Sequence, residues 1–162
     1  MEYPTPSTVA EWDDASLFAA AGSESALRYG TDGFEALNDV ERSLALLYLL
    51  EAEVNNGGFG QWIWSVCPRG AAETPLVLQM IGATDMAAFV SNALLPFGDL
   101  TQYATKEEWL DNYLAFADAT GYADDLPVPL ESLTKPFLEL EDSFLLLAYA
   151  YTRKHWKNVR TG

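Results

Sequence analysis

The chain has 162 residues, of which 49% are hydrophobic and 13% aromatic, and its formal net charge is −15. This hydrophobic content excludes a wholly disordered chain, and the length predicts one domain, residues 1–162, with a core large enough to fold without covalent staples. The single cysteine, Cys67, excludes an internal disulfide and cannot by itself form a cysteine-clustered metal site.

The charge is unevenly distributed along the chain. Residues 1–152 hold five basic and all 24 acidic residues, a charge of −19, and the other four bases follow residue 152. Direct nucleic-acid binding needs clusters of Lys and Arg against the phosphates. The excess of acidic residues therefore excludes direct binding to nucleic acid. An acidic surface is typical either of simple solubility or of a protein that binds a basic partner.

The first residues, MEYPTPSTVAEWDD, lack the basic and apolar parts of a secretion leader. The longest apolar run, residues 44–50, is too short to span a bilayer. We therefore expect a cytoplasmic protein without a membrane segment.

The first half of the chain predicts three helices. Ser7 or Thr8 is expected to cap a first helix that ends near Ala21, closed by Gly22-Ser23. Residues 40–54 are Leu-rich and follow Asn38, a good N-cap, which predicts a central and mostly buried helix. An Asn-Asn-Gly-Gly turn then leads into an aromatic helix over residues 59–66.

The second half predicts further helices and one long loop. Thr74-Pro75 is expected to open a helix that ends at residue 81, and residues 84–95 form the next one. Thr105-x-x-Glu108 is a capping box before a helix over residues 105–120, and residues 121–129 are the main loop. Thr134 begins the last helix. No segment alternates with the period of a strand, so we expect a single compact all-α multi-helix domain.

The turn after the central helix concentrates polar side chains. Glu51 and Glu53 lie in a last helical turn, where the helix dipole disfavours carboxylates, so both are expected to have partners. The free N–H groups of residues 58–60 are the nearest candidates. Three side-chain donors follow on the next helix: Gln61, Trp62 and Trp64. Gly57 or Gly58 is expected to have a positive φ.

Two interpretations of this turn remain open. It is either a structural corner whose polar groups satisfy one another, or a small polar pocket with an aromatic wall between two helices. The candidate residues are the same in both cases: Glu51, Glu53, Asn55, Asn56, Gly57, Gly58, Phe59, Gln61, Trp62 and His155.

The same turn carries a resemblance to a known family. The matching features are the run Glu51-x-Glu53-Val54-Asn55-Asn56-Gly57-Gly58-Phe59-x-Gln61-Trp62, then Ile81-Gly82-Ala83 and Tyr149-x-Tyr151-x3-His155. Over about residues 38–159 the chain resembles the bacterial DNA-mimic protein nineteen-like family, which is otherwise catalogued as a domain of unknown function. The resemblance implies an all-helical, acidic protein that occupies the DNA-binding surface of a regulator.

The catalytic inventory is thin, because the sequence contains no phosphate loop, His-Glu-x-x-His, Gly-x-Ser-x-Gly or Cys-x-x-Cys motif. His155 is the only histidine, and it is either an acid-base partner of Glu51 or Glu53 or an ordinary packing residue near a helix end. Asp124-Asp125 and Glu139-x-Glu141-Asp142 lack the spacing of a calcium loop. We predict no catalytic residue, metal or cofactor.

One acidic row has helical geometry. Residues three and four apart on a helix lie about 5 to 6 Å apart, a spacing comparable with neighbouring phosphates. The row is either the solvated face of an amphipathic helix or part of a DNA-mimic surface. Its members are Glu107, Glu108, Asp111 and Asp118, with Asp124 and Asp125 as a continuation.

We therefore expect an acidic protein-binding module without catalysis, and favour a DNA mimic that occupies the DNA-binding face of a regulator. One alternative is a carboxylate-based enzyme or small-ligand binder around Glu51, Glu53, Gln61, Trp62 and His155. Another is a neutraliser of a basic toxin. The sequence identifies neither the partner nor the oligomeric state.

Overall fold

The structure is a computed structural model, and it describes residues 3–66, 68–111 and 130–161. These residues form helices and no strand, which confirms the all-α prediction. Residues 106–111 are also helical and are called helix 106–111 below. The α-helices are α1 Asp14–Asp32, α2 Asp39–Val66, α3 Arg69–Met80, α4 Thr84–Leu94 and α6 Thr134–His155. The 3-10 helices are η1 Val9–Glu11, η2 Phe34–Ala36, η3 Leu95–Phe97, η4 Leu100–Gln102, η6 Leu130–Leu133 and η7 Trp156–Asn158.

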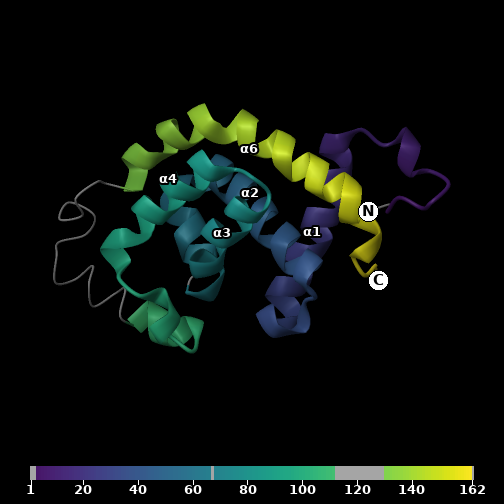
Figure 1. Cartoon of the computed structure of the whole chain (residues 1–162). Coiled ribbons are helices and arrows are strands. Elements are labelled where there is room, and N and C mark those ends of the chain that lie inside the picture. The colour runs from purple at the N-terminus through teal and green to yellow at the C-terminus, as the bar shows by residue number, and fades with distance from the viewer. Residues whose placement is uncertain (1–2, 67, 112–129, 162) are drawn as a thin grey trace.

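Helix α2 is the centre of the fold, because α1, α3, α6 and η6 all pack against it. Helix α6 arches over α4, α2 and α1, and the two ends of the described chain lie together beside α1 (Figure 1). The main core joins the apolar face of α2 to the inner faces of α3, α4 and α6. Its largest fully buried side chains include Phe59, Trp62, Phe137 and Phe144.

Helix α2 begins as the sequence predicts. The Asn38 side-chain oxygen accepts a hydrogen bond from the Glu41 N–H at 2.9 Å, and the Glu41 carboxylate accepts one from the Asn38 N–H at 3.0 Å. This reciprocal pair satisfies two N–H groups that a helix start leaves without partners. The cap at Thr105 is also confirmed, because its hydroxyl accepts from the Glu108 N–H at 3.1 Å.

The first helix differs from the prediction in both of its ends. Asp13, rather than Ser7 or Thr8, caps α1, and the helix continues through Gly22 to Asp32. Gly22 is buried, and a Cβ atom there would lie 2.6 Å from the Cβ of Tyr48. The glycine therefore allows α1 and α2 to approach closely and does not end the helix.

Helix α3 begins before the predicted position. It starts at Arg69, with Pro68 as its N-cap residue, and Pro75 lies inside it. Thr74 is buried and its hydroxyl donates to the Gly70 carbonyl at 2.7 Å, so it is not an N-cap. The prediction that Thr74-Pro75 opens this helix was wrong, because Gly70 and Ala71 are buried against the rest of the core and extend the helix in the N-terminal direction.

A kink at two glycines divides α2 into two helical parts. Gly57 has φ −146° and ψ 15°, and Gly58 has φ 80° and ψ 179°. The second pair of angles belongs to a region that is essentially restricted to glycine. The predicted positive φ is therefore confirmed at Gly58, and the kink turns the aromatic helix, residues 59–66, back toward the rest of α2.

Substituting Ala at Gly58 is expected to lower the free energy of unfolding by about 1 to 3 kcal/mol, because a side chain is strained at these angles. The new Cβ would also lie 3.1 Å from the Thr134 hydroxyl oxygen at the start of α6. Urea denaturation measures the change. Gly60→Ala is the matched control: a Cβ there meets Leu130 at an ordinary 3.7 Å, so its stability should be equal or higher. Equal midpoints for the two variants would contradict the strain.

Candidate functional site

The kink holds Glu53 in a network of side-chain donors. Its carboxylate oxygen accepts a hydrogen bond from Gln61 Nε2 at 2.7 Å and another from the Ser65 hydroxyl at 3.1 Å. Both donors come from the second part of α2, one helical turn apart. The predicted amide partner is therefore confirmed. The expected bonds to the N–H groups of residues 58–60 are absent from the described residues, because Gln61 and Ser65 reach the carboxylate instead.

Glu51 lies on another face of α2 and is directed toward α6. Burial raises the pKa of Glu51, and the nearby carboxylate of Glu141 raises it further. Asn55 stands between the two helices, since its amide donates to the Glu51 carbonyl and to the Glu141 carboxylate. Burial raises the pKa of Tyr149, and the carboxylates of Glu51 and Glu141 raise it further. Glu51 and Glu53 therefore belong to two separate polar groups.

The aromatic residues of the motif fill the core and do not line an open wall. Phe59 and Trp62 are fully buried, with ring centroids 4.9 Å apart, and Phe59 also packs edge-on against Phe89. The Trp62 indole nitrogen has no hydrogen-bond partner among the described residues. Trp64 is 44% exposed. Asn56 and Gly57 are exposed at the surface of the kink.

His155 lies far from both carboxylates of the motif. It ends α6, about four helical turns or roughly 20 Å beyond Glu141, which is the part of α6 that faces Glu51. Its ring packs on Tyr151, with centroids 4.6 Å apart. The structure therefore does not bring His155 together with Glu51 and Glu53.

The described part of the acidic row lies on an exposed helix face. Glu107, Glu108 and Asp111 are exposed in helix 106–111, whereas Trp109 is 2% exposed and packs against Phe97 and Tyr103. Glu108 also accepts from the Ala104 N–H at 2.8 Å and so helps to cap its own helix. The other members of the row, Asp118, Asp124 and Asp125, lie outside the described residues.

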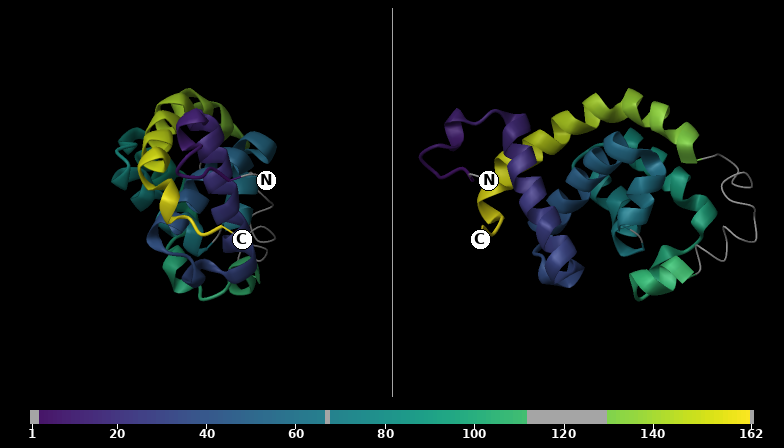
Figure 2. Two further views of the ribbon diagram at one scale, coloured as in Figure 1. Left: turned by 90° about the vertical axis from the view of Figure 1, so that its right-hand side faces the viewer. Right: turned by 180° about the vertical axis from the view of Figure 1, so that it is seen from behind.

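A second acidic pair lies on α6, within the Glu139-x-Glu141-Asp142 run that lacks the spacing of a calcium loop. Glu139 and Asp142 are both exposed, and their spacing of three residues places them on one helix face. The three-residue spacing of Glu139 and Asp142 in the sequence could have indicated this shared face. Helix 106–111 and the first half of α6 both lie in the part of the molecule remote from the two chain ends, in the views from front and back (Figures 1 and 2).

The arginines compensate a different set of acids. Each of the five arginines forms an ion pair with a carboxylate between Asp14 and Glu41. The two segments that carry the exposed acidic groups contain one lysine each, namely Lys106 in helix 106–111 and Lys135 in the first half of α6. The negative potential is therefore expected to be strongest over helix 106–111 and the first half of α6.

Among the described residues, no group of three or more His, Cys, Asp or Glu side chains is arranged to hold a metal ion. In the same residues, none of the helices has both the length and the apolar character that crossing a bilayer requires.

The chain was compared with known proteins in three ways. Neither the search of curated proteins nor the search of solved structures found a match. A family profile described as "DMP19-like protein" matches residues 35–155, which include the kink of α2, helix 106–111 and all of α6. With most of its length inside this match, the chain belongs to the DMP19-like protein family.

Proposed function

We propose that this protein binds a basic, DNA-binding protein and acts as a DNA mimic on its DNA-binding face. The observation that carries the proposal is the separation of charge. The arginines are paired with acids between Asp14 and Glu41, whereas no arginine among the described residues pairs with the exposed carboxylates of Glu107, Asp111, Glu139 and Asp142. The DMP19-like family match is consistent with this role.

Carboxylates can replace phosphates when they are exposed, closely spaced and fixed. Glu107 and Asp111 are four residues apart and Glu139 and Asp142 three apart, so helix geometry holds each pair about 5 to 6 Å apart between Cβ atoms. A basic surface that normally binds the DNA backbone would meet these groups with Lys and Arg side chains.

The enzyme alternative lacks an assembled site. Glu53 is bonded to Gln61 and Ser65, Glu51 faces α6, and His155 is about four helical turns from the part of α6 that Glu51 faces. An acid-base couple of His155 with either carboxylate would need reacting groups within hydrogen-bond reach. We therefore do not propose catalysis.

The experiment is capture from cell extract on the immobilised protein, at low and at high salt, followed by competition. A captured DNA-binding protein should be released by salt and displaced by its own DNA duplex, because both ligands would use the same basic residues. A complex that binds DNA and this protein at the same time would contradict mimicry. Capture of a basic protein that does not bind DNA would instead favour the toxin-neutraliser alternative.

A further inference from the structure

A pocket outside the acidic surfaces lies between α1, η2, the middle of α2, the start of α3 and the segment that leads into helix 106–111. Its volume is about 580 Å³. Ligand sites for small molecules typically have volumes of roughly 300 to 1,000 Å³. The pocket combines apolar side chains, such as Leu49 and Pro68, with a few polar ones, which is the composition of such sites.

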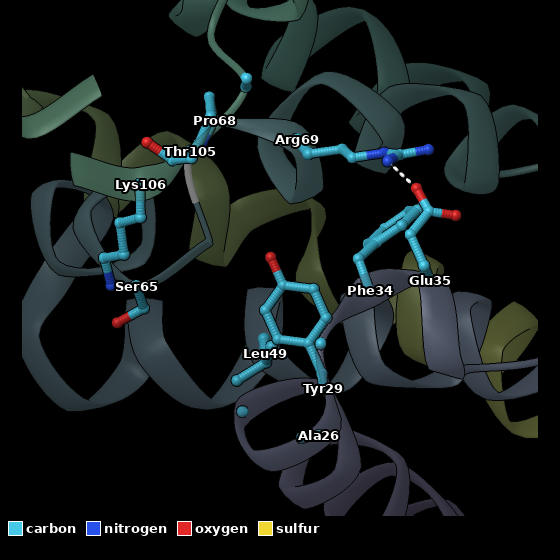
Figure 3. Close-up of a pocket in the computed structure, with 13 residues that line it drawn as sticks. Ala26, Tyr29, Phe34, Glu35, Leu49, Ser65, Pro68, Arg69, Thr105 and Lys106 are labelled. Carbon is cyan, nitrogen blue, oxygen red and sulfur yellow. Dashed lines mark hydrogen bonds and ion pairs between the residues drawn. The ribbon is translucent and has the colours of Figure 1, made fainter. Parts of the chain in front are cut away.

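Two cations lie at this pocket in a chain that has only nine. Arg69 and Lys106 come from elements far apart in the sequence, and Figure 3 shows them on different sides of the pocket. Arg69 forms an exposed ion pair with Glu35. The pocket therefore has two positive groups and one negative group, the reverse of the balance in the whole chain.

The space between these cations also has an aromatic surface that suits the ring of an anionic ligand. The Tyr29 hydroxyl points toward the middle of the residues drawn in Figure 3, and it donates to the Val66 carbonyl at 3.2 Å. The Ser65 hydroxyl also lines the pocket and donates to the Glu53 carboxylate, so the protons of both hydroxyls are already used within the protein. The aromatic surface comes from Tyr29 and Phe34, whose rings meet edge-on.

The start of α3 adds to the positive potential at the same place. Pro68 and Arg69 line the pocket, and α3 has no side-chain cap at its N-terminus. First-turn N–H groups without a capping side chain favour a nearby anion. The Arg69 guanidinium itself lies 4.6 Å from the centroid of the Phe34 ring, which fixes the cation at the pocket edge.

We propose that this pocket binds a small organic anion that carries a phosphate or carboxylate group on an aromatic ring. Lys106 and Arg69 bind the anionic group, and the ring packs on Tyr29 and the apolar lining. Binding requires Arg69 to divide its hydrogen bonds between Glu35 and the ligand. Lys106 belongs to helix 106–111, but none of the exposed acidic residues of the proposed function lines the pocket, so binding of the small anion does not require the protein partner.

The test uses the whole protein and three probes that share a phenyl ring: phenyl phosphate, benzoate and the uncharged phenol. Binding is followed by amide shifts in nuclear magnetic resonance spectra at about 0.15 M salt, where screening limits the repulsion between the anion and the acidic residues of the protein. At least one of the two anions should shift the amide signals of pocket residues such as Tyr29 and Gly33. The Kd should be about millimolar, as expected for a ligand with so few atoms. Which anion binds identifies the headgroup.

Three variants locate the site. Lys106→Met should weaken anion binding about tenfold, because it removes a charge-assisted contact, and Lys135→Met on α6 should leave binding unchanged. Glu35→Gln should strengthen binding several-fold, since it frees Arg69 for the ligand. The proposal is overturned if neither anion shifts the pocket residues, if phenol binds as tightly as the anions, or if Lys106→Met or Glu35→Gln has no effect.

Discussion

Glu41→Gln should lower the free energy of unfolding by about 3 kcal/mol at neutral pH. The Glu41 carboxylate is fully buried and accepts hydrogen bonds from the Asn38 N–H at 3.0 Å, from the Arg160 N–H at 2.9 Å and from Arg160 Nε at 2.9 Å. An amide of the same size cannot satisfy this set of donors. Chemical denaturation at pH 7 measures the loss.

The effect should depend on pH with a definite sign. Burial alone would raise the pKa of Glu41, but the hydrogen bonds from Arg160 and Asn38 outweigh it and lower the pKa from 4.5 to about 2. A carboxyl whose folded pKa is depressed stabilises the fold above its unfolded pKa and loses this contribution as the pH falls toward the folded pKa. The difference in stability between the native protein and Glu41→Gln should therefore shrink from pH 5 to pH 2.

Glu51→Gln is the matched control for this prediction. Burial and the Glu141 carboxylate raise the pKa of Glu51, so its charge opposes folding at neutral pH. Removing that charge should leave stability unchanged or raise it by about 0.5 kcal/mol. If the Glu41→Gln difference stayed constant between pH 5 and pH 2, it would come from packing and not from the charge.

The sequence predicts most helices correctly because their signals are local. The cap at Asn38 and the cap at Thr105 depend on residues three positions apart, and the positive φ at Gly58 follows from a glycine pair after a long apolar run. The failures occur where a distant contact decides the local structure. Gly22 looks like a helix end, but it lies inside α1 because Tyr48 of α2 packs directly on it.

Contacts at the candidate site could likewise be predicted only where the two residues are close in the sequence. The bond between Glu53 and Gln61 was predictable, because the turn between them is short. The separation of Glu51 from Glu53 also had a signal, since residues two apart on a helix face different directions. In contrast, the bond between Glu41 and Arg160 joins residues 119 positions apart, and no local pattern in the sequence indicates it.

Removing the charges of helix 106–111 should weaken the complex with a basic partner about tenfold or more. The variant combines Glu107→Gln, Glu108→Gln and Asp111→Asn, which keep side-chain size. Glutamine at position 108 can still accept from the Ala104 N–H, so the helix cap should survive. Binding to a captured DNA-binding protein is measured over a range of salt concentrations, and circular dichroism checks the fold.

A matched pair of double variants separates local contacts from net charge. Glu139→Gln with Asp142→Asn removes two exposed charges from α6, and Glu11→Gln with Asp13→Asn removes two exposed charges near the chain ends. Asparagine at position 13 can still cap α1. Both variants change the net charge equally, so a general electrostatic attraction would weaken equally in both.

A mimic surface predicts unequal effects from these two variants. If carboxylates of α6 replace phosphates, its double variant should lower the affinity and also reduce the slope of affinity against salt, because fewer ion pairs form in the complex. The variant near the chain ends should mainly slow association, since it alters only the long-range field. Equal losses in both variants, or a salt slope that none of them changes, would show that the partner responds to total charge and not to an arranged surface.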